Sequence, residues 1–290
     1  MSVEHAAALI RSGKLVAFPT ETVYGLGANA LDLHAVERIF TAKGRPRSSP
    51  LIVHVDSIEM ARRFAAHWPD AAEKLARYYW PGPLTLVVPK QPEIPDIVTA
   101  GLPTVGLRMP AQPLALELIR RAGVPIAAPS ANRFTELSPT TAAHVPESLA
   151  DYVLDGGPAR VGIESTVLSL AEEPVLLRPG VIPLPEIEAL IGPVAPAPDP
   201  DAAPHPSPGL HPRHYRPKTL LFVGEPPAKG RGIYLRIGQD MPSDPISYAA
   251  ALYETLHRLD AQSLDWIAVE PPPDTPEWAG VRDRLRRAAQ

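Results

Sequence analysis

The stretch KLVAFPTETVYGLG, residues 14–27, sets a short apolar strand directly before a cluster of hydroxyl side chains and glycines. Lys14–Pro19 is predicted to be the strand, and Thr20–Tyr24 supplies the hydroxyls. Hydroxyls and exposed backbone amides at the end of a strand suit a small polar ligand, although an ordinary glycine turn explains the same residues equally well. A dinucleotide fingerprint is not favoured, because Gly25 comes too late after the strand and no acidic residue near position 50 could hold a ribose.

Outward from this stretch, the predicted elements form an α/β chain in which strands outnumber helices. A helix is expected over Asp32–Lys43, because Asp32 suits the N-cap and apolar residues recur on one face. Strands are expected at Leu51–Val55, Leu84–Val88, Thr104–Met109, Val124–Ala128, Tyr152–Leu154, Ser165–Leu170 and Pro174–Leu177. Several of these strands follow one another without an intervening helix, which indicates a mixed, twisted sheet with flanking helices.

A proline-rich segment divides the chain. Nine residues between Pro193 and Pro217 are proline, and proline fixes φ and removes a backbone donor, so neither helix nor sheet is expected to run through. The predicted organisation is a larger domain over residues 1–182, a linker over 183–217 and a small domain over 218–290. The order strand, strand, helix, strand, helix predicts an α/β, Rossmann-like fold for the small domain.

Composition excludes several classes of protein. Apolar residues make up 45% of the 290 residues, which is enough for real cores. There is no cysteine, so thiolate nucleophiles, disulfides and cysteine-ligated zinc are excluded. The net charge of −4 gives no bulk attraction for polyanions, and neither a signal peptide nor a membrane-spanning run is expected. The expected location is therefore the cytoplasm.

Local charge offers a site for an anion. Lys43, Arg45 and Arg47 occupy alternate positions on a loop stiffened by Gly44 and two prolines. Arginine presents a planar fork to phosphate oxygens, so a stiff loop of this kind suits a triphosphate, whereas a solvated basic loop is the plainer explanation. Arg108 stands inside an apolar strand, where it must meet either a core acid or an anionic ligand.

Other polar groups stand at predicted strand ends or in the linker. They are Ala127–Asn132, Glu164–Thr166, Leu177–Gly180, Ser207–Gly209 and His214–Pro217. Taken alone, Ala127–Asn132 is better explained by a strand exit, and the linker groups are better explained by a spacer.

Taken together, the motifs resemble one family. PTETVYGLG, KGRP, PLIVHV, PTVGLRMP, APSAN, ESTV, LRPG and HYRP occur in the order of the threonylcarbamoyl-AMP synthases, which have a YrdC-like catalytic domain. The resemblance extends to Asp283–Leu285 and to the two-domain long form of the family. The chain departs from the family at Ser49, where Asn is common, and at Arg216, where Ala is common.

The resemblance implies a reaction and a set of site residues. Family members join L-threonine, bicarbonate or CO2, and ATP, forming threonylcarbamoyl-AMP and pyrophosphate for threonylcarbamoyladenosine in tRNA. The residues implied for threonine are Thr22, His54, Arg108, Ala128 and Ser165. Those implied for ATP are Arg45, Ser49, Thr104, Ser130, Ser138, Arg178 and Tyr215. Lys43, Arg45 and Arg108 are the expected catalytic groups, and Lys43 and Arg47 are expected to add charge near the phosphates.

The resemblance also implies cofactors and partners. Mg2+ is expected to be carried by the ATP phosphates, without a protein metal site. The expected partners are the three substrates and downstream proteins that transfer the threonylcarbamoyl group to tRNA, and the linker with Tyr215 is expected to close over the nucleotide. The alternatives are a non-catalytic RNA-binding module that uses the Lys43–Arg47 cations, a carbamoyltransferase-type enzyme, which the missing cysteines argue against, and the disfavoured nicotinamide dehydrogenase.

Overall fold

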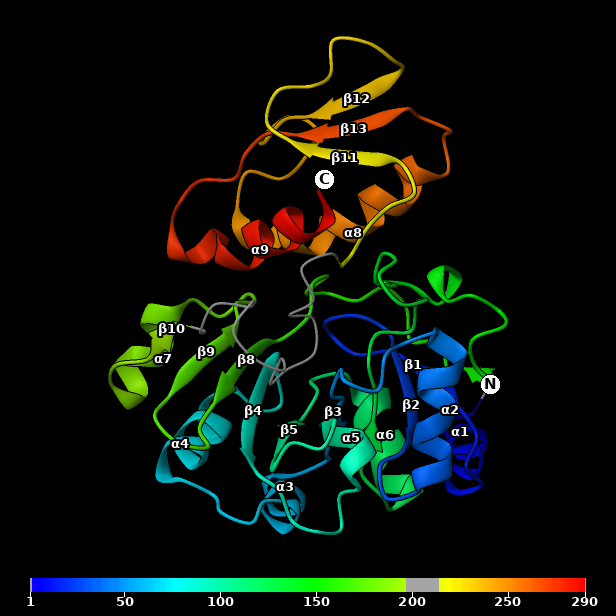
Figure 1. The fold of residues 1–290 in the computed structure, drawn as a ribbon, viewed down its shortest axis with the longest axis vertical. Helices are drawn as coiled ribbons and strands as arrows, with labels where there is room; N and C mark the ends of the chain where they lie inside the picture. Colours follow the sequence, from blue (N-terminus) through cyan, green and yellow to red (C-terminus); the bar gives the residue numbers. More distant parts are fainter. Residues whose placement is uncertain (1, 197–213, 290) are drawn as a thin grey trace.

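The computed structural model describes residues 2–196 and 214–289, which form two sheets with their helices (Figure 1). The larger sheet has ten strands in the order β10-β9-β8-β4-β5-β3-β6-β2-β1-β7. They are β1 Val16–Phe18, β2 Gly25–Asn29, β3 Ile52–His54, β4 Leu84–Pro89, β5 Thr104–Arg108, β6 Ile126–Ala127, β7 Tyr152–Val153, β8 Thr166–Ser169, β9 Val175–Arg178 and β10 Ala195–Pro196. β3 and β5 are parallel, as are β4 and β8, whereas β4 and β5 are antiparallel. The predicted mixed sheet is confirmed.

Seven α-helices of the described residues accompany this sheet. They are α1 Val3–Arg11, α2 Leu33–Lys43, α3 Ile58–Phe64, α4 Asp70–Tyr79, α5 Asp96–Thr99, α6 Pro113–Ala122 and α7 Leu184–Ile191. The Asp32 side chain caps α2 by accepting from the amides of His34 and Ala35, as predicted. Gly44 ends α2 in the left-handed region at φ 65°, a conformation that turns the chain and delivers Arg45 beyond the helix end.

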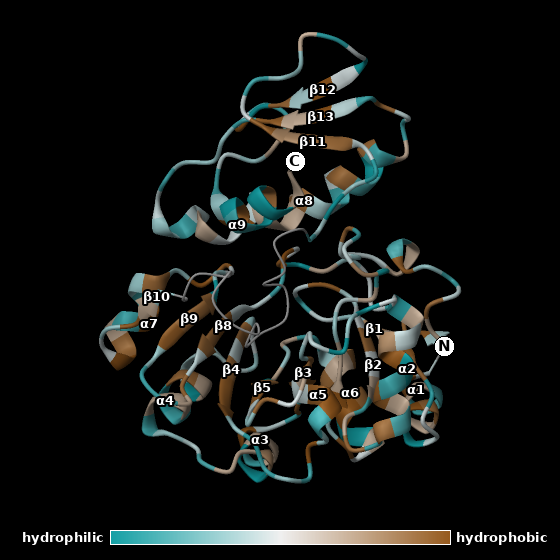
Figure 2. Ribbon diagram, in the orientation of Figure 1, coloured by the Kyte–Doolittle hydropathy of each residue, from teal (hydrophilic) through white to brown (hydrophobic). Residues whose placement is uncertain are grey.

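The two faces of the sheet differ in chemistry because side chains alternate along each strand. Val53, Leu86 and Leu107 point into the main apolar core, which contains buried residues of α2, α3 and α4. Their strand neighbours His54 and Arg108 point to the opposite face. The hydropathy colouring in Figure 2 marks β4, β8 and β9 as mostly apolar strands.

Helices α1 and α6 cover only part of that opposite face. Their buried residues pack with Val16, Phe18 and Ile126 of β1 and β6 in a second apolar cluster. The rest of the face, over β3, β5, β4 and β8, carries polar side chains beside the apolar Val87 and Val167. Among the polar side chains, Thr85 and Ser165 share a hydrogen bond of 2.7 Å. This polar part of the face is where a ligand can meet the sheet.

The smaller unit is a three-stranded parallel sheet with two α-helices. Its elements are β11 Leu220–Val223, β12 Gly232–Leu235, α8 Pro245–Asp260, β13 Trp266–Val269 and α9 Ala279–Ala288. The strand order is β11-β13-β12, and α8 and α9 lie between this sheet and the larger unit (Figure 1). One buried apolar cluster joins Val23 and Ile163 of the larger unit to Tyr248 and Tyr253 of α8, so the two units share a core.

Residues 183–196, expected as the start of the linker, form regular structure. Pro183 and Pro185 stand at the N-terminus of α7, where proline is tolerated, and α7 packs on α4. β10 pairs with β9 in parallel. The segment therefore extends the larger sheet, because proline marks a helix start here rather than a tether. The rest of the expected linker up to residue 213, with Ser207–Gly209, lies outside the described residues.

Within the described ranges, none of the helices has the length and apolarity that crossing a bilayer demands.

Candidate active site

A cavity lies over the polar face of the larger sheet and encloses about 530 Å3, part of it open to solvent. Its walls come from segments far apart in the sequence. They are Thr20, Thr22, Val23, Gly25, Arg45, Ile52, His54, Arg108, Ala128, Pro129, Ser130, Glu164, Ser165, Arg178, His214 and Tyr215. Most of these residues stand at strand ends or just beyond them, where side chains and backbone amides are free of the sheet ladder.

Three arginines line the cavity, and they make it a site for anions. Arg45 donates from Nη2 to Ser49 Oγ at 2.6 Å and to the carbonyl of Pro50 at 2.9 Å. Burial lowers the pKa of Arg45 to about 10, and the Arg178 charge adds to this, but the group stays protonated at neutral pH. Arg178 donates from Nε and Nη2 to the carbonyl of Ser165 at 3.1 and 3.0 Å. Buried guanidinium groups of this kind bind carboxylates and phosphates strongly.

The third arginine, Arg108, meets a core acid and also lines the cavity. Its Nη2 donates to Glu21 Oε1 at 2.7 Å, and its Nε donates to the carbonyl of Gly82 at 3.3 Å. Glu21 Oε2 accepts from the amide of Ala111. The two interpretations of Arg108 as a core-acid partner and as a cavity group are therefore compatible.

Two polar atoms of the cavity are buried without a partner in the described part of the chain. They are Nδ1 of His54 and the hydroxyl of Tyr215. A buried polar atom left unpaired costs about 1–3 kcal/mol, so these atoms mark positions where a ligand would donate or accept. Burial and the neighbouring Arg108 charge lower the pKa of His54 to about 3, which keeps the imidazole neutral at physiological pH.

The residues implied for threonine come together. Thr22, His54, Arg108, Ala128 and Ser165 all line the cavity, although they come from five separate segments. Among the residues implied for ATP, those that line it as well are Arg45, Ser130, Arg178 and Tyr215. Arg178 and Tyr215 lie close to Glu164, and both also act electrostatically on Arg45.

Three further residues implied for ATP have other contacts. Ser49 accepts a hydrogen bond from Arg45 and so orients that guanidinium. Thr104 begins β5, at the opposite end of the strand from Arg108, and pairs with Pro89. Ser138 is buried and donates to Glu164 at 2.5 Å. None of the three lines the cavity.

Lys43 and Arg47 do not line the cavity either. The buried ammonium of Lys43 donates to the backbone carbonyls of Ser130 and Asn132. Burial and the Arg45 charge lower its pKa well below the ordinary value. Lys43 thus fixes the loop that carries Ser130, and Arg47 pairs with Glu37 on the surface. Lys43, Arg45 and Arg47 alternate in the sequence, but only Arg45 faces the cavity. One reason is that Gly44 turns the chain between Lys43 and Arg45.

The implied set also omitted wall residues, of which Glu164 and His214 are the most polar. Both belong to motifs that were identified in the sequence, ESTV and HYRP, so the sequence contained the information needed to select them. Thr20 was part of the PTETVYGLG motif and organises the turn after β1, because its hydroxyl donates to the carbonyl of Val23 at 2.6 Å.

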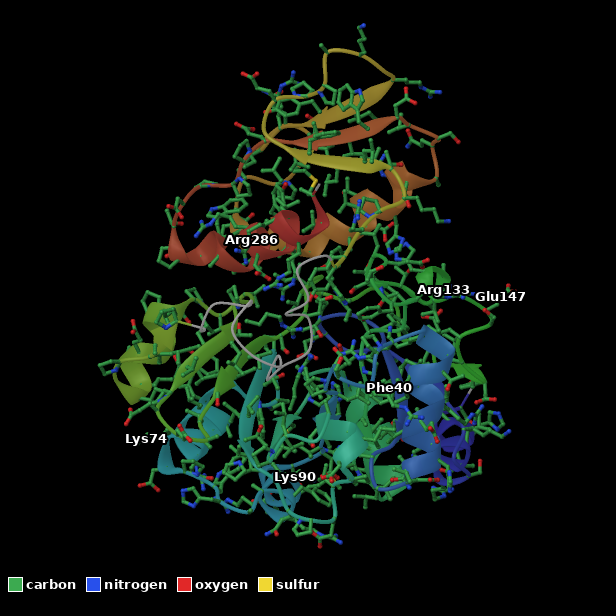
Figure 3. The ribbon with its side chains drawn as sticks, viewed as in Figure 1. Phe40, Lys74, Lys90, Arg133, Glu147 and Arg286 are labelled. Atoms are coloured by element: carbon green, nitrogen blue, oxygen red, sulfur yellow. The ribbon has the colours of Figure 1, made fainter. Side chains whose placement is uncertain are left out.

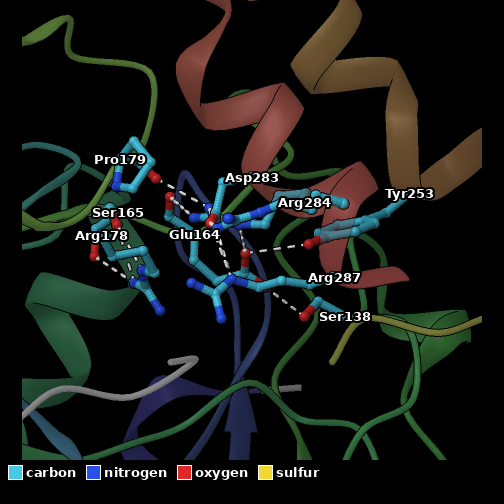
Figure 4. A network of polar contacts seen from close by, with 10 residues as sticks. Ser138, Glu164, Ser165, Arg178, Pro179, Tyr253, Asp283, Arg284 and Arg287 are labelled. Atoms are coloured by element: carbon cyan, nitrogen blue, oxygen red, sulfur yellow. Dashed lines mark hydrogen bonds and ion pairs between the residues drawn. The ribbon is translucent and has the colours of Figure 1, made fainter. Parts of the chain in front are cut away.

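Glu164 is the centre of a buried network that joins the two units (Figure 4). Ser138 donates to its Oε1, while the Tyr253 hydroxyl and Arg284 Nε donate to its Oε2 at 3.2 and 2.7 Å. Burial disfavours ionisation of Glu164, but the charges of Arg284 and Arg178 outweigh it and lower the pKa below the ordinary value. Glu164 is therefore an ionised, fully engaged carboxylate.

The carboxylates in and beside the cavity, among the described residues, are paired with arginines. Glu164 of the cavity wall is paired with Arg284, and nearby Glu21 is paired with Arg108. No cluster of three or more histidine or carboxylate side chains suited to a metal occurs in residues 2–196 and 214–289.

Comparison with known proteins assigns both units. Residues 8–180 match the family model described as "Telomere recombination", and residues 182–290 match that of the "Threonylcarbamoyl-AMP synthase, C-terminal domain". The threonylcarbamoyl-AMP synthase of Pyrococcus abyssi is 43% identical over 98% of this chain and 93% of its own length. The chain belongs to the threonylcarbamoyl-AMP synthase family.

Further relatives agree with this membership. The threonylcarbamoyl-AMP synthase of Bacillus subtilis is 41% identical, with 99% of this chain and 92% of the relative covered. The crystal structure of P. abyssi Sua5 complexed with L-threonine superposes with a TM-score of 0.93 at 42% identity, covering 99% of this chain and 94% of that one. The family's fold, a mixed α/β sheet with a smaller second unit, is the fold described above. These relatives favour the catalytic interpretation over an RNA-binding module.

Proposed function

We propose that this chain is an L-threonylcarbamoyladenylate synthase that makes threonylcarbamoyl-AMP and pyrophosphate from L-threonine, bicarbonate or CO2, and ATP. The observation that carries the proposal is the cavity itself. Arg45, Arg108 and Arg178 line one cavity together with His54 and Tyr215, whose Nδ1 and hydroxyl have no partner in the described residues. Such a site suits two anionic substrates held side by side. The relatives' names and the threonine complex of P. abyssi Sua5 support the same assignment.

The chemistry needs no covalent enzyme intermediate. The threonine amine forms a C–N bond to CO2, or to bicarbonate with loss of water, and gives up a proton to yield a carbamate. A carbamate oxygen then attacks the α-phosphorus of ATP, and the bond between that phosphorus and the bridging oxygen to the β-phosphate breaks, releasing pyrophosphate. Positioning and stabilisation of charge are the protein's main contributions to such a transfer.

In this proposal, the residues implied for threonine bind the amino acid, and those implied for ATP bind the nucleotide. Arg108 binds the threonine carboxylate, with Thr22, His54, Ala128 and Ser165 around the rest of the amino acid. Neutral His54 accepts or donates a hydrogen bond without adding charge. Arg45 and Arg178 bind the phosphates, and Ser130 and Tyr215 contact the nucleotide. Mg2+ enters as the ATP complex and is part of the substrate.

The product serves tRNA in this proposal. Threonylcarbamoyl-AMP passes to proteins that transfer the threonylcarbamoyl group to adenosine in tRNA, and the reaction takes place in the cytoplasm, where ATP and tRNA are found.

The test is a requirement for every substrate. Purified protein incubated with Mg–ATP should release pyrophosphate, and form an equal amount of the adenylate, only when threonine and bicarbonate are both present. Valine in place of threonine is the matched control for the side-chain hydroxyl. Equal pyrophosphate release without threonine would refute the proposal.

A further inference from the structure

Arg284 of α9 is the largest fully buried side chain of the described residues, yet it does not line the cavity. Burying an arginine is costly unless its donors are all used. Its contacts lead to three separate walls of the cavity, those at Ser165, Arg178 and Tyr215.

The first contact is to the wall at Glu164 and Ser165. Arg284 Nε donates to the Glu164 carboxylate at 2.7 Å, and Nη2 donates to the Glu164 backbone carbonyl at 3.1 Å. Holding both the side chain and the backbone of Glu164 fixes the peptide that leads into Ser165. Ser165 in turn presents its carbonyl to Arg178.

The second and third contacts are to the walls at Arg178 and Tyr215. Arg284 Nη1 donates to the carbonyl of Pro179 at 3.0 Å, directly after Arg178. The guanidinium carbon also lies 5.3 Å from the centre of the Tyr215 ring, a distance suited to cation–π attraction. One planar group thus touches the segments that carry Ser165 and Arg178 (Figure 4) and also the ring of Tyr215.

The surroundings of Arg284 fix its orientation. Asp283 accepts from Nη1 at 2.8 Å and is itself held by Arg287. Two glycines let α9 approach the wall, because a Cβ atom on Gly280 would lie 2.3 Å from the carbonyl oxygen of Gly180. An ion pair that served only to join the units would need none of these backbone contacts beside the cavity.

We propose that Arg284 is a positioning residue for the synthase reaction, holding Ser165, Arg178 and Tyr215 in the geometry that binds ATP and threonine. The inference rests on the proposed function. It gives the second unit a part in catalysis that does not involve contact with the substrates.

The decisive variant is Arg284→Lys. Lysine keeps the charge that Glu164 requires but replaces the planar fork with a single ammonium, which cannot reach Glu164, Pro179 and Tyr215 together. Arg284→Met removes the charge as well. Arg286→Lys is the matched control, because Arg286 lies on the same helix with a side chain that is 73% exposed (Figure 3).

Initial rates of pyrophosphate release give kcat and KM for each substrate, calorimetry gives ATP affinity, and thermal unfolding reports the fold. Arg284→Lys should unfold in one transition close to the parent but show KM values for ATP and threonine raised about 10- to 100-fold, as small misplacements of binding groups do. Arg286→Lys should match the parent. Parent-like KM values and ATP affinity in a folded Arg284→Lys protein would overturn the inference, and so would a Met variant with parental kinetics. Failure of the proposed function would be seen separately, as a parent protein with no threonine-dependent pyrophosphate release.

Discussion

His54 and Arg108 occupy paired positions on the neighbouring parallel strands β3 and β5, so their side chains lie next to each other on the cavity face of the sheet. A fixed cation beside a buried imidazole opposes its protonation. Together with burial, which is the larger cause, this lowers the pKa of His54 to about 3.

The first prediction concerns the pH dependence of stability. In the unfolded chain a histidine binds a proton below about pH 6.5, whereas folded His54 does so only near pH 3. Falling pH therefore favours the unfolded state. Relative to His54→Asn, the parent should lose about 2 kcal/mol of unfolding free energy between pH 6.5 and pH 5. Urea unfolding at several pH values measures this, with the exposed-residue variant His67→Asn as control. Equal losses in parent and His54→Asn would contradict the assignment.

The second prediction separates stability from binding at Arg108. Arg108→Leu should destabilise the protein by about 3–5 kcal/mol, because Glu21 would remain as an unpaired buried carboxylate. Arg108→Leu combined with Glu21→Leu should recover much of that loss. Both proteins should bind threonine about 10- to 100-fold more weakly, since a charge-assisted hydrogen bond is lost. Calorimetric titration with threonine decides; a double variant that also regains threonine affinity would make Arg108 purely structural.

The third prediction distinguishes two arginines of one loop. Arg45 is buried in the cavity, whereas the Arg47 side chain is 68% exposed and pairs with Glu37. Arg45→Ala should weaken ATP binding about 10- to 100-fold and threonine binding much less, because a buried guanidinium–phosphate contact is lost. Arg47→Ala should change ATP affinity by less than about threefold, as exposed charges do. If the two variants bind ATP alike, the triphosphate lies elsewhere.

The fourth prediction concerns the Tyr215 hydroxyl. Burial raises the pKa of this group, so it is a neutral donor at physiological pH, and it has no protein partner within the described residues. Tyr215→Phe keeps the ring and should leave the unfolding free energy within about 0.5 kcal/mol of the parent. ATP affinity should fall about 2- to 10-fold, the value of one hydrogen bond. Tyr215→Ala, which also removes the ring, should lower both quantities. Unchanged ATP binding in Tyr215→Phe would show that the hydroxyl does not meet the nucleotide.

Sequence reasoning went furthest where the cause of a structure is local. Asp32 and Gly44 mark the ends of α2 through their own capping preferences, and both were readable from the chain. Sequence reasoning failed where a structure depends on contacts between neighbouring strands. Gly25 and Gly27 belong to the buried strand β2, because the Phe18 ring packs against them and a Cβ on Gly27 would lie 2.8 Å from it. No local pattern predicts that contact, so the sequence alone left a ligand-binding segment and a glycine turn equally open for this stretch.

The same distinction holds for the site. The ordered motifs identified the segments that line the cavity, including those with His54 and Arg108. They did not show which polar atoms turn inward. Lys43 binds backbone carbonyls and Ser138 binds Glu164. The orientation of both side chains therefore depends on residues far away in the chain. Motif order therefore predicts which segments meet, whereas the orientation of each side chain is set by tertiary packing.

The contact between Glu164 and Arg284 spans 120 residues of sequence. During translation, every wall of the cavity leaves the ribosome before α9 does. Until α9 arrives, Glu164 lacks its cationic partner, and the segments around Ser165 and Arg178 are not held together. On the proposed role of Arg284, a growing chain that lacks α9 is expected to bind ATP more weakly than the finished protein. Closing such a distant contact is a late event in folding, because the entropy of the long intervening loop must first be lost. In this proposal, the synthesis of α9 sets the moment at which the site becomes able to bind its substrates.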